Sequence, residues 1–496
     1  MRRPALLATA LLLAGCTVGP NYRPPEAATP PAYVDPQPAV SGSVDLARPW
    51  ATFGDPLLTG LIERALRDNP DVRIAASRVR QARLQEIIAR AGGKPMLNAD
   101  ANGTYIHFSK NAGLATLAQQ FGGGGGGSGG GAAGGSGSSG GIALPGDSVT
   151  TYALGFDASW ELDVFGGNRR AVQGAVARTE AAIWNGRDAA TMIAAEVAQG
   201  YWALRLDQAQ LAIVTDELAR QRRSLGIAEE QAKVGLVPNA DLTQQRATVA
   251  TTEARAEPIR ADLEVRAHAL AILLNQAPAA LVPELRAPAP ALLPAPVIPA
   301  GLPSDLLRRR PDVRAAERNL AAATADIGVA VADLYPRFSL TGMEQLISTA
   351  LGNLFSGDSL QLTGSGAVQF PIIDWGRRRA TVKLRREDRE QAYVSYQATV
   401  LQALKDVEDA LAQLDAERRR NVTLQRAVND ALGTANAREA QYRTGFVAQN
   451  TLLDAQAQVL SAREQLAGSD AQLRQMTVAL MKALGGGWED GAAGPR

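Results

Sequence analysis

Few residues in this chain have side chains suited to covalent or metal chemistry. The 496 residues include two histidines, His107 and His268, and one cysteine, Cys16. Neither histidine has a cysteine or a second histidine beside it, so a His-based metal site or a Ser-His triad is not expected. A single cysteine also excludes an intramolecular disulfide and a Cys-based metal cluster. We therefore expect neither an enzyme nor a bound cofactor or metal.

Cys16 is the exception, because the sequence before it predicts covalent lipid attachment. Two arginines precede an apolar run at residues 5–13 that is too short to span a bilayer as a helix, as in a secretory signal peptide. The run ends in Leu13-Ala14-Gly15-Cys16, which is typical of a bacterial lipobox. We expect residues 1–15 to be removed and Cys16 to carry a diacylglycerol and an N-acyl chain as a membrane anchor. The alternative is an ordinary secretory signal that ends in cysteine by chance.

The charged clusters favour solvation over ligand binding. With 51 basic and 50 acidic residues the net charge is +1, so no global field attracts nucleic acid. Arg308-Arg309-Arg310 and Arg377-Arg378-Arg379 lack interleaved aromatics, which favours solvated faces or helix flanks over polyanion sites. We expect Asp406 and Asp409 on an exposed helix face, where they serve solubility.

A run of Gly and Ser at residues 121–141 has no phosphate-loop pattern, because the Lys-Ser/Thr ending is missing. The run predicts a flexible loop. In a membrane β-barrel, for which the evidence follows below, long loops lie at the extracellular mouth, so we expect this one there. A role in surface recognition is the alternative.

The segments expected to position these residues occur as two similar copies in the sequence. Asn69-Pro70-Asp71-Val72-Arg73 recurs as Arg310-Pro311-Asp312-Val313-Arg314. Further on, Val234-Gly235-Leu236-Val237 recurs as Thr444-Gly445-Phe446-Val447 at a smaller offset, because the first copy carries the extra residues 121–141. The sequence therefore predicts an internal duplication with one insertion.

Each copy contains a stretch with a period of two. Over residues 152–164 apolar residues that include three aromatics alternate with polar residues that include three acids. A half-buried soluble strand is the alternative, but so long an alternation favours a membrane strand with its apolar face outward. Residues 360–372 repeat the pattern, and a weaker partner strand precedes each. We expect two β-hairpins, at about 97–164 and 337–373.

Four strands cannot close a membrane barrel. An open edge leaves backbone groups unpaired in lipid at several kcal/mol each, and single-chain barrels begin at about eight strands. Copies of the chain must therefore share one barrel, with about eight strands from a dimer or twelve from a trimer.

Long helices follow each hairpin. Segments 194–234 and 241–274 are separated by a turn at residues 235–239, and segments 393–444 and 451–484 repeat the arrangement. At about 1.5 Å per residue, about forty residues span roughly 60 Å, so these helical hairpins must project from the membrane. Narrow apolar stripes predict coiled-coil-like packing. One stripe consists of Leu401, Leu404, Val407, Leu411 and Leu414.

These expectations give a domain order. The order is a signal peptide at 1–15, a lipid-anchored strap at 16–49, a first repeat at 50–278 with a helical hairpin at 194–274, a Pro-rich crossing strap at 279–303, a second repeat at 304–484 with a helical hairpin at 393–484, and a disordered tail at 485–496. Within the first repeat, residues 55–91 are predicted to be helical with a break at Asn69-Pro70.

Short motifs spread over nearly the whole mature chain carry a family resemblance. They are Cys16-Thr17-Val18-Gly19-Pro20-Asn21-Tyr22, Trp50 with Phe53-Gly54-Asp55-Pro56-Leu57, the paired Pro-Asp-Val-Arg segments, Asp333-Leu334-Tyr335-Pro336, Trp375-Gly376-Arg377, Tyr442-Arg443-Thr444-Gly445 and Leu452-Leu453-Asp454-Ala455-Gln456. This set resembles the TolC-like outer membrane factors of tripartite efflux pumps, in particular the NodT-type lipoprotein branch associated with resistance-nodulation-division (RND) transporters. Thr17 stands where an inner-membrane retention signal would place Asp, which also favours the outer membrane.

The resemblance implies a mainly α-helical homotrimer. In this family a twelve-stranded β-barrel in outer-membrane lipid continues into a twelve-helix α-barrel in the periplasm. It implies passive conduction of solutes such as drugs, received from a periplasmic membrane-fusion adaptor and an inner-membrane RND transporter. A periplasmic coiled-coil lipoprotein that acts as an adaptor or scaffold is the alternative, although it would not need the alternation at residues 152–164.

The resemblance also places adaptor docking and the channel entrance at the hairpin tips. The tip residues are Gly235, Leu236, Val237, Asp241 and Leu242 in the first copy, and Gly445, Phe446, Val447, Leu452 and Leu453 in the second. Related channels narrow the entrance with acidic rings. The position that aligns here holds Asn436, and Asp430, earlier on the same predicted helix, is the substitute acid.

Overall fold

The computed structural model describes residues 17–26, 30–34, 49–107, 148–235, 238–286, 295–296, 298, 303, 309–444 and 446–486. These residues form two units. A sheet unit takes in the described residues within 1–20, 87–172 and 326–384, and a helical unit takes in the others.

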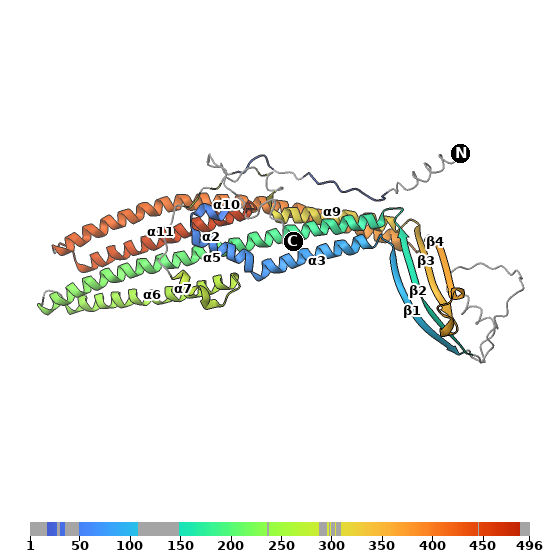
Figure 1. Ribbon diagram of the computed structural model, residues 1–496. Coiled ribbons are helices and arrows are strands. Elements are labelled where there is room, and N and C mark those ends of the chain that lie inside the picture. The colour runs from blue at the N-terminus through green and yellow to red at the C-terminus, as the bar shows by residue number, and fades with distance from the viewer. Residues whose placement is uncertain are drawn as a thin grey trace, which may run out of the picture. The chain divides into compact units, whose positions relative to one another are not determined.

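The sheet unit has four antiparallel strands in the order β1-β2-β3-β4 (Figure 1). The strands are β1 Met96–His107, β2 Ser148–Leu162, β3 Arg337–Ser348 and β4 Leu360–Gln369. The predicted hairpins therefore exist as β1-β2 and β3-β4, and the pairing of β2 with β3 joins the two copies in one sheet.

The register places most polar side chains on one face of the sheet and most apolar ones on the other, although Met96, Met343 and Ile347 lie on the polar face. On the polar face Asn98 donates to Asp157 at 3.1 Å, and Gln345 donates to Gln361 at 3.2 Å. The other face carries exposed large apolar side chains on every strand. They include Leu97, Tyr105, Leu154, Phe156, Trp160, Leu340, Leu360 and Leu362. Glu344, which pairs with Phe156 and Leu362, is an acid among them.

The long helices come in pairs of equal length. The helices are α2 Pro56–Asp68, α3 Pro70–Ala91, α5 Gly167–Lys233, α6 Asn239–Leu273, α7 Val282–Leu285, α9 Pro311–Ala332, α10 Arg377–Arg443 and α11 Gln449–Ala483. α5 and α10 each have 67 residues, α6 and α11 each have 35, and α3 and α9 each have 22. Such matched lengths are expected from a duplicated chain.

Both long helices begin earlier than the sequence analysis predicts. α5 starts at Gly167 and α10 at Arg377, whereas helical hairpins were expected from residues 194 and 393. The added turns are rich in alanine or charged residues and contain no proline. Once a helix is nucleated, each further residue adds a hydrogen bond at little cost, so polar turns join it without an apolar stripe.

The Asn69-Pro70 break lies between α2 and α3. Asn69 Oδ1 accepts from the N–H groups of Asp71 and Val72 at 2.8 and 3.3 Å, which caps α3. Its Nδ2 donates to the carbonyl of Leu273, the last residue of α6, at 2.8 Å. The equivalent Arg310 donates to the carbonyl of Ala483, the last residue of α11, at 3.2 Å. The two copies thus share this contact between a helix start and a hairpin end.

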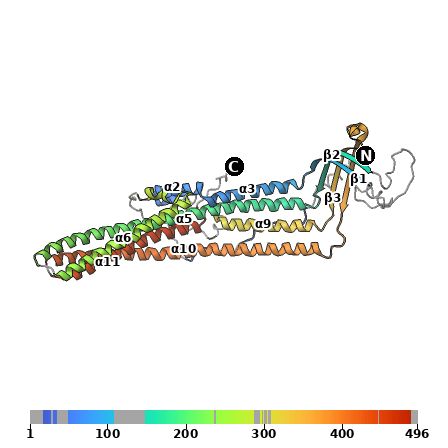
Figure 2. The same ribbon diagram turned by 90° about the horizontal axis from the view of Figure 1, so that it is seen from below.

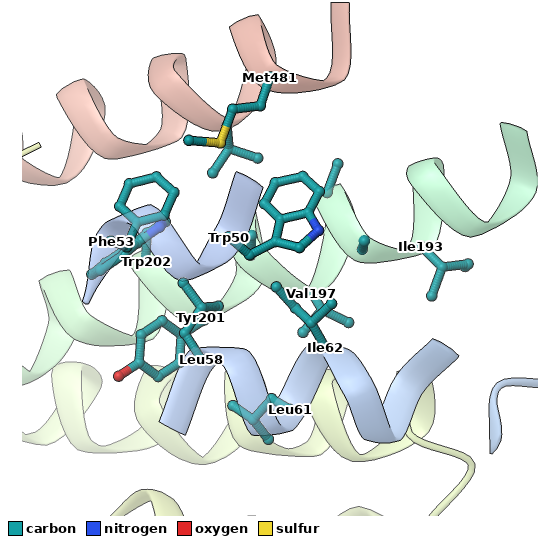
Figure 3. Close-up of a cluster of buried hydrophobic side chains, with 14 of the residues drawn as sticks. Trp50, Phe53, Leu58, Leu61, Ile62, Ile193, Val197, Tyr201, Trp202 and Met481 are labelled. Carbon is teal, nitrogen blue, oxygen red and sulfur yellow. The ribbon is translucent and has the colours of Figure 1, made fainter. Parts of the chain in front are cut away.

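The core of the helical unit gathers segments that are distant in sequence. Trp50 and Phe53 pack against Trp202 of α5 and Met481 of α11 (Figure 3). Leu281 and Leu285 join the same buried cluster. A contiguous cluster of this kind, built from distant segments, is what stabilises a helical domain.

The Phe53-Gly54-Asp55-Pro56 motif has a structural role in this core. Asp55 Oδ1 accepts from the N–H groups of Leu57 and Leu58, which caps α2, and Asp55 Oδ2 accepts from the Tyr201 hydroxyl at 2.5 Å. Burial, reinforced by this bond, raises the pKa of the Tyr201 phenol. The motif therefore fixes α2 on α5.

The N-terminal strap contacts each unit through its own residues. In the sheet unit, Arg170 donates to the carbonyls of Val18 and Gly19 at 3.1 and 3.2 Å. In the helical unit, Tyr22 donates to Glu317 at 2.9 Å, and the N–H of Val34 donates to Glu408 at 3.0 Å.

Three expectations need correction. Arg310 directly precedes α9 and so flanks a helix, as one of the two expectations for its cluster had it, but it is buried rather than solvated. It pairs with Asp312 at 2.7 Å and with Asp406 at 3.0 Å, so Asp406 does not serve solubility alone. Leu401 is exposed, although Val407, Leu411 and Leu414 of its stripe are buried. All three differences have the same physical reason: contacts with residues distant in sequence decide which face of a helix is buried.

The predicted crossing strap and tail also begin differently. Residues 278–285, expected mostly in the strap at 279–303, form a 3-10 turn, Pro278–Leu281, and α7, because proline is tolerated in a first helical turn. Gly485 and Gly486 close α11 rather than opening a disordered tail, since Gly486 N–H donates to Met481 at 3.0 Å. Residues 487–496 lie outside the described residues.

No single described helix is long and apolar enough to cross a membrane. Together, α6 and the segment Pro278–Leu285 meet that length and composition test, with a bend of 110° between them.

Candidate docking site at the helical hairpin tips

The first tip, between α5 and α6, turns through a glycine. Gly235 has φ of +73°, a left-handed conformation in which a side chain would be strained, and its N–H donates to Ala232 at 3.0 Å. After the turn, the N–H groups of Asp241 and Leu242 both donate to the Pro238 carbonyl, which starts α6. α5 and α6 lie side by side (Figures 1 and 2), joined by Arg246 to Glu229 at 2.9 Å.

The second tip, between α10 and α11, presents an aromatic side chain. Phe446 is 83% exposed, while its N–H donates to the Gln441 carbonyl at 2.9 Å and so ends α10. Val447 and Leu453 are half-buried, and Leu452 is buried. An exposed phenylalanine at the end of a helical hairpin provides an anchor suited to a partner protein.

The two tips contact each other within the helical unit. Gln449 of α11 donates to Gln245 of α6 at 2.5 Å, and both side chains are buried. Burial and, next, the nearby Asp241 carboxylate raise the pKa of the Tyr442 phenol. These contacts place the first turns of α6 next to the end of α10 and the start of α11, so the described parts of the two tips lie close together.

Sequence reasoning missed the glutamine pair. A glutamine in a helix interior and one at a helix start carry no pattern that marks them as partners. Only their shared closeness to the repeated Val-Gly-Leu-Val and Thr-Gly-Phe-Val turns could have singled them out. Gln245 Nε2 is also buried and makes no hydrogen bond with a described residue, so the pair is only partly satisfied and part of its burial cost remains.

The predicted gate residues lie on one helix. Asp430 and Asn436 are both exposed on α10, and Asp430 contributes its backbone carbonyl to Thr434. Four other predicted site residues, Cys16, Leu236, Val237 and Gly445, lie outside the described residues. Among the described residues, no group of His, Cys, Asp or Glu side chains could hold a metal ion.

The family model described as outer membrane efflux protein matches residues 61–276 and 302–486. These two matched blocks cover most of the chain and fall on the two copies. The chain belongs to the outer membrane efflux protein family.

Relatives of this outer membrane efflux protein match along almost their whole length. The probable efflux pump outer membrane protein TtgC of Pseudomonas putida is 31% identical, over 98% of this chain and 95% of the relative. Nodulation protein T of Rhizobium leguminosarum bv. viciae is 29% identical, over 96% of this chain and 92% of the relative. The solved outer-membrane channel OprN superposes with a TM-score of 0.81 at 30% identity, over 95% of this chain and 100% of that one.

Membership places this outer membrane efflux protein among the TolC-like outer membrane factors, as the sequence motifs indicated. Its location is the outer membrane. The periplasmic scaffold alternative is therefore disfavoured by the family, and the hairpin tips remain the candidate site for a partner.

Proposed function

We propose that this protein is the exit duct of a tripartite efflux pump, conducting solutes such as drugs passively out of the cell. The observation that carries the proposal is the open four-stranded sheet, which has one mostly polar face and one mostly apolar face. A sheet with those two faces suits a wall between water and lipid.

The edges of the sheet support a shared barrel. β1 offers an unpaired edge of 12 residues and β4 one of 10 residues in the described chain. In lipid each unpaired backbone group costs several kcal/mol, so β1 of one copy must pair with β4 of the next. Three copies would give a twelve-stranded barrel, about the size that leaves an aqueous lumen, and twelve helices in the continuing α-barrel.

The length of the helices supports a periplasmic duct. A helix of 67 residues is roughly 100 Å long at about 1.5 Å per residue, several times the bilayer core. The tips would meet a membrane-fusion adaptor and an inner-membrane RND transporter, with Phe446 as the anchor. Asp430 and Asn436 would lie near the entrance. The chain would need no catalytic residue, since the pump supplies the energy.

The shared barrel is tested by a charge on either face of the same strand. Phe156→Asp places a carboxylate on the apolar face of β2, whereas Ser159→Asp places one on the polar face. We expect heat-modifiable trimers in detergent-extracted outer membranes for wild type and Ser159→Asp, and loss of trimer for Phe156→Asp because the charge would face lipid.

Equal trimer yields for the two variants would contradict the proposal that the apolar face of the sheet faces lipid in a shared barrel. A chain released from membranes without detergent once Cys16→Ser removes the lipid would favour the periplasmic scaffold instead. The same variant tests lipidation at Cys16. By mass spectrometry, wild type should carry the mass of the attached acyl groups, and Cys16→Ser should lack it.

A further inference from the structure

A cavity of about 400 Å³ lies where four helices of the helical unit meet. Its walls come from α5, the start of α9, α10 and α11. This volume falls in the range of small-molecule sites, about 300–1,000 Å³. The cavity is distant in sequence from the hairpin tips and has no part in the proposed conduction.

Two residues on one turn of α5 line this cavity and have no hydrogen-bond partner among the described residues. The Thr191 side chain is nearly fully buried, with the residue 3% exposed, and its hydroxyl makes no hydrogen bond with a described residue. Helical threonines ordinarily bond to the carbonyl four residues earlier, so an unused hydroxyl is uncommon. Asp188, three residues before it, makes no hydrogen bond or ion pair with a described residue, although both residues line the cavity.

The other acids in the walls already have partners. Asp312 and Asp406 bind Arg310, Asp406 also accepts from Gln402 at 2.6 Å, and Asp409 pairs with Lys405 at 2.6 Å. Among the described residues, four carboxylates and two cations, Arg310 and Lys482, line the cavity. The walls therefore carry a surplus of negative charge, and Asp188 is the carboxylate left over.

This arrangement suits an organic cation better than a metal. No group of three acidic, His or Cys side chains among the described residues converges as metal ligands would. Asp188 and Thr191 instead offer two carboxylate oxygens and one hydroxyl oxygen on one helix face, which match the three N–H donors of a primary ammonium group. The cavity has room for a short alkyl chain behind it.

We propose that the cavity binds a small organic cation through a primary ammonium group, held by the Asp188 carboxylate and the Thr191 hydroxyl. Burial and the nearby Asp312 raise the pKa of Asp188, while Arg310 and Lys482 oppose that shift. An ammonium ligand would relieve the cost of keeping this carboxylate charged. The site is independent of the duct role, so its failure would leave that proposal unchanged.

Calorimetry on the detergent-purified full chain tests the site at fixed pH and ionic strength. The probes are 1,4-diaminobutane, n-butylamine, uncharged 1-butanol and Mg²⁺. We expect saturable binding of the two amines with one site per chain, and none of 1-butanol. Asp188→Asn and Thr191→Val should each weaken amine binding about tenfold or more, because each removes a contact to a charged group.

Matched variants separate the site from general charge effects. Asp415→Asn removes an exposed carboxylate on α10 that pairs with Arg419, and it should bind as wild type does. Thr191→Ser keeps the hydroxyl and should restore binding. The proposal is overturned if Asp188→Asn binds normally, if no amine saturates, or if Mg²⁺ binds the same site as tightly. Thermal melting of each variant checks that it folds.

Discussion

At the scale of single residues, equivalent positions in the two copies make the same contact with different chemistry. Asn69 uses a neutral amide and Arg310 a charged guanidinium, yet each binds the last carbonyl of the hairpin helix in its own copy. Arg310 adds ion pairs with Asp312 and Asp406, which satisfy a charge that would otherwise be costly to bury.

Replacing Asn69 should destabilise the helical unit. Asn69→Ala removes the cap of α3 and the bond to Leu273, so we expect a loss of about 1–3 kcal/mol in unfolding free energy. Denaturant titration followed by circular dichroism measures it. Asn239→Ala, at an exposed first residue of α6, is the control and should cost less than about 0.5 kcal/mol. Equal losses would show that Asn69 has no special role.

Asp188 should make stability depend on pH. Its pKa is raised in the fold by burial and by Asp312, so the folded state binds the proton more tightly than the unfolded chain. Its destabilising effect is therefore present above the raised pKa and is lost as pH falls through that pKa toward the ordinary carboxyl value. Asp188→Asn should raise the melting temperature at neutral pH without ligand, with a difference that disappears below the ordinary value. A difference that grows on acidification would contradict this sign.

At the scale of elements, close backbone approach fixes the strap in the sheet unit. A Cβ on Gly328 of α9 would lie 2.7 Å from Cγ of Arg170, the side chain that binds the carbonyls of Val18 and Gly19. A Cβ on Gly60 of α2 would meet nothing within 4 Å. The same substitution at these two helical glycines therefore has opposite expected effects.

We predict opposite signs for Gly328→Ala and Gly60→Ala. The first should cost about 1 kcal/mol or more through crowding and should speed hydrogen exchange in residues 17–20. The second should stabilise α2 by about 0.5–1 kcal/mol, since alanine loses less entropy in a helix. Hydrogen exchange with mass spectrometry and thermal melting report both. If Gly60→Ala also speeds exchange in residues 17–20, the Gly328 contact is not what holds the strap.

At the scale of the whole molecule, function depends on surfaces that one chain leaves uncovered. The apolar face of the sheet, the two strand edges and Phe446 are all exposed in the single chain. Lipid, neighbouring copies and an adaptor are the partners that the proposed function assigns to these surfaces.

The tip should support efflux without supporting assembly. Phe446→Asp should leave the trimer band intact and reduce dye efflux severalfold in cells whose only outer-membrane duct is this protein, since an apolar anchor is lost. Phe446→Leu keeps an apolar side chain and should retain most of the efflux. Loss of the trimer band in Phe446→Asp, or undiminished efflux, would remove the tip from adaptor docking.

The sequence by itself determined the features that follow from local pattern. Alternation marked the strands, Asn69-Pro70 marked a helix break, and the repeated motifs marked the duplication and the family. The turn expected at residues 235–239 begins at Gly235, whose φ of +73° ends the helix, because such a turn depends mainly on neighbouring backbone atoms.

Only the tertiary structure decided which distant residues meet. Arg310 was read as solvated or as a helix flank, and Asp406 as solvated. Gln245 and Gln449 were not noticed, and Asp188 and Thr191 were not singled out. Arg310 and Asp406 lie 96 residues apart, and Gln245 and Gln449 lie 204 apart. Local periodicity carries no information on such pairs, since burial of a polar group is settled by what another helix brings against it.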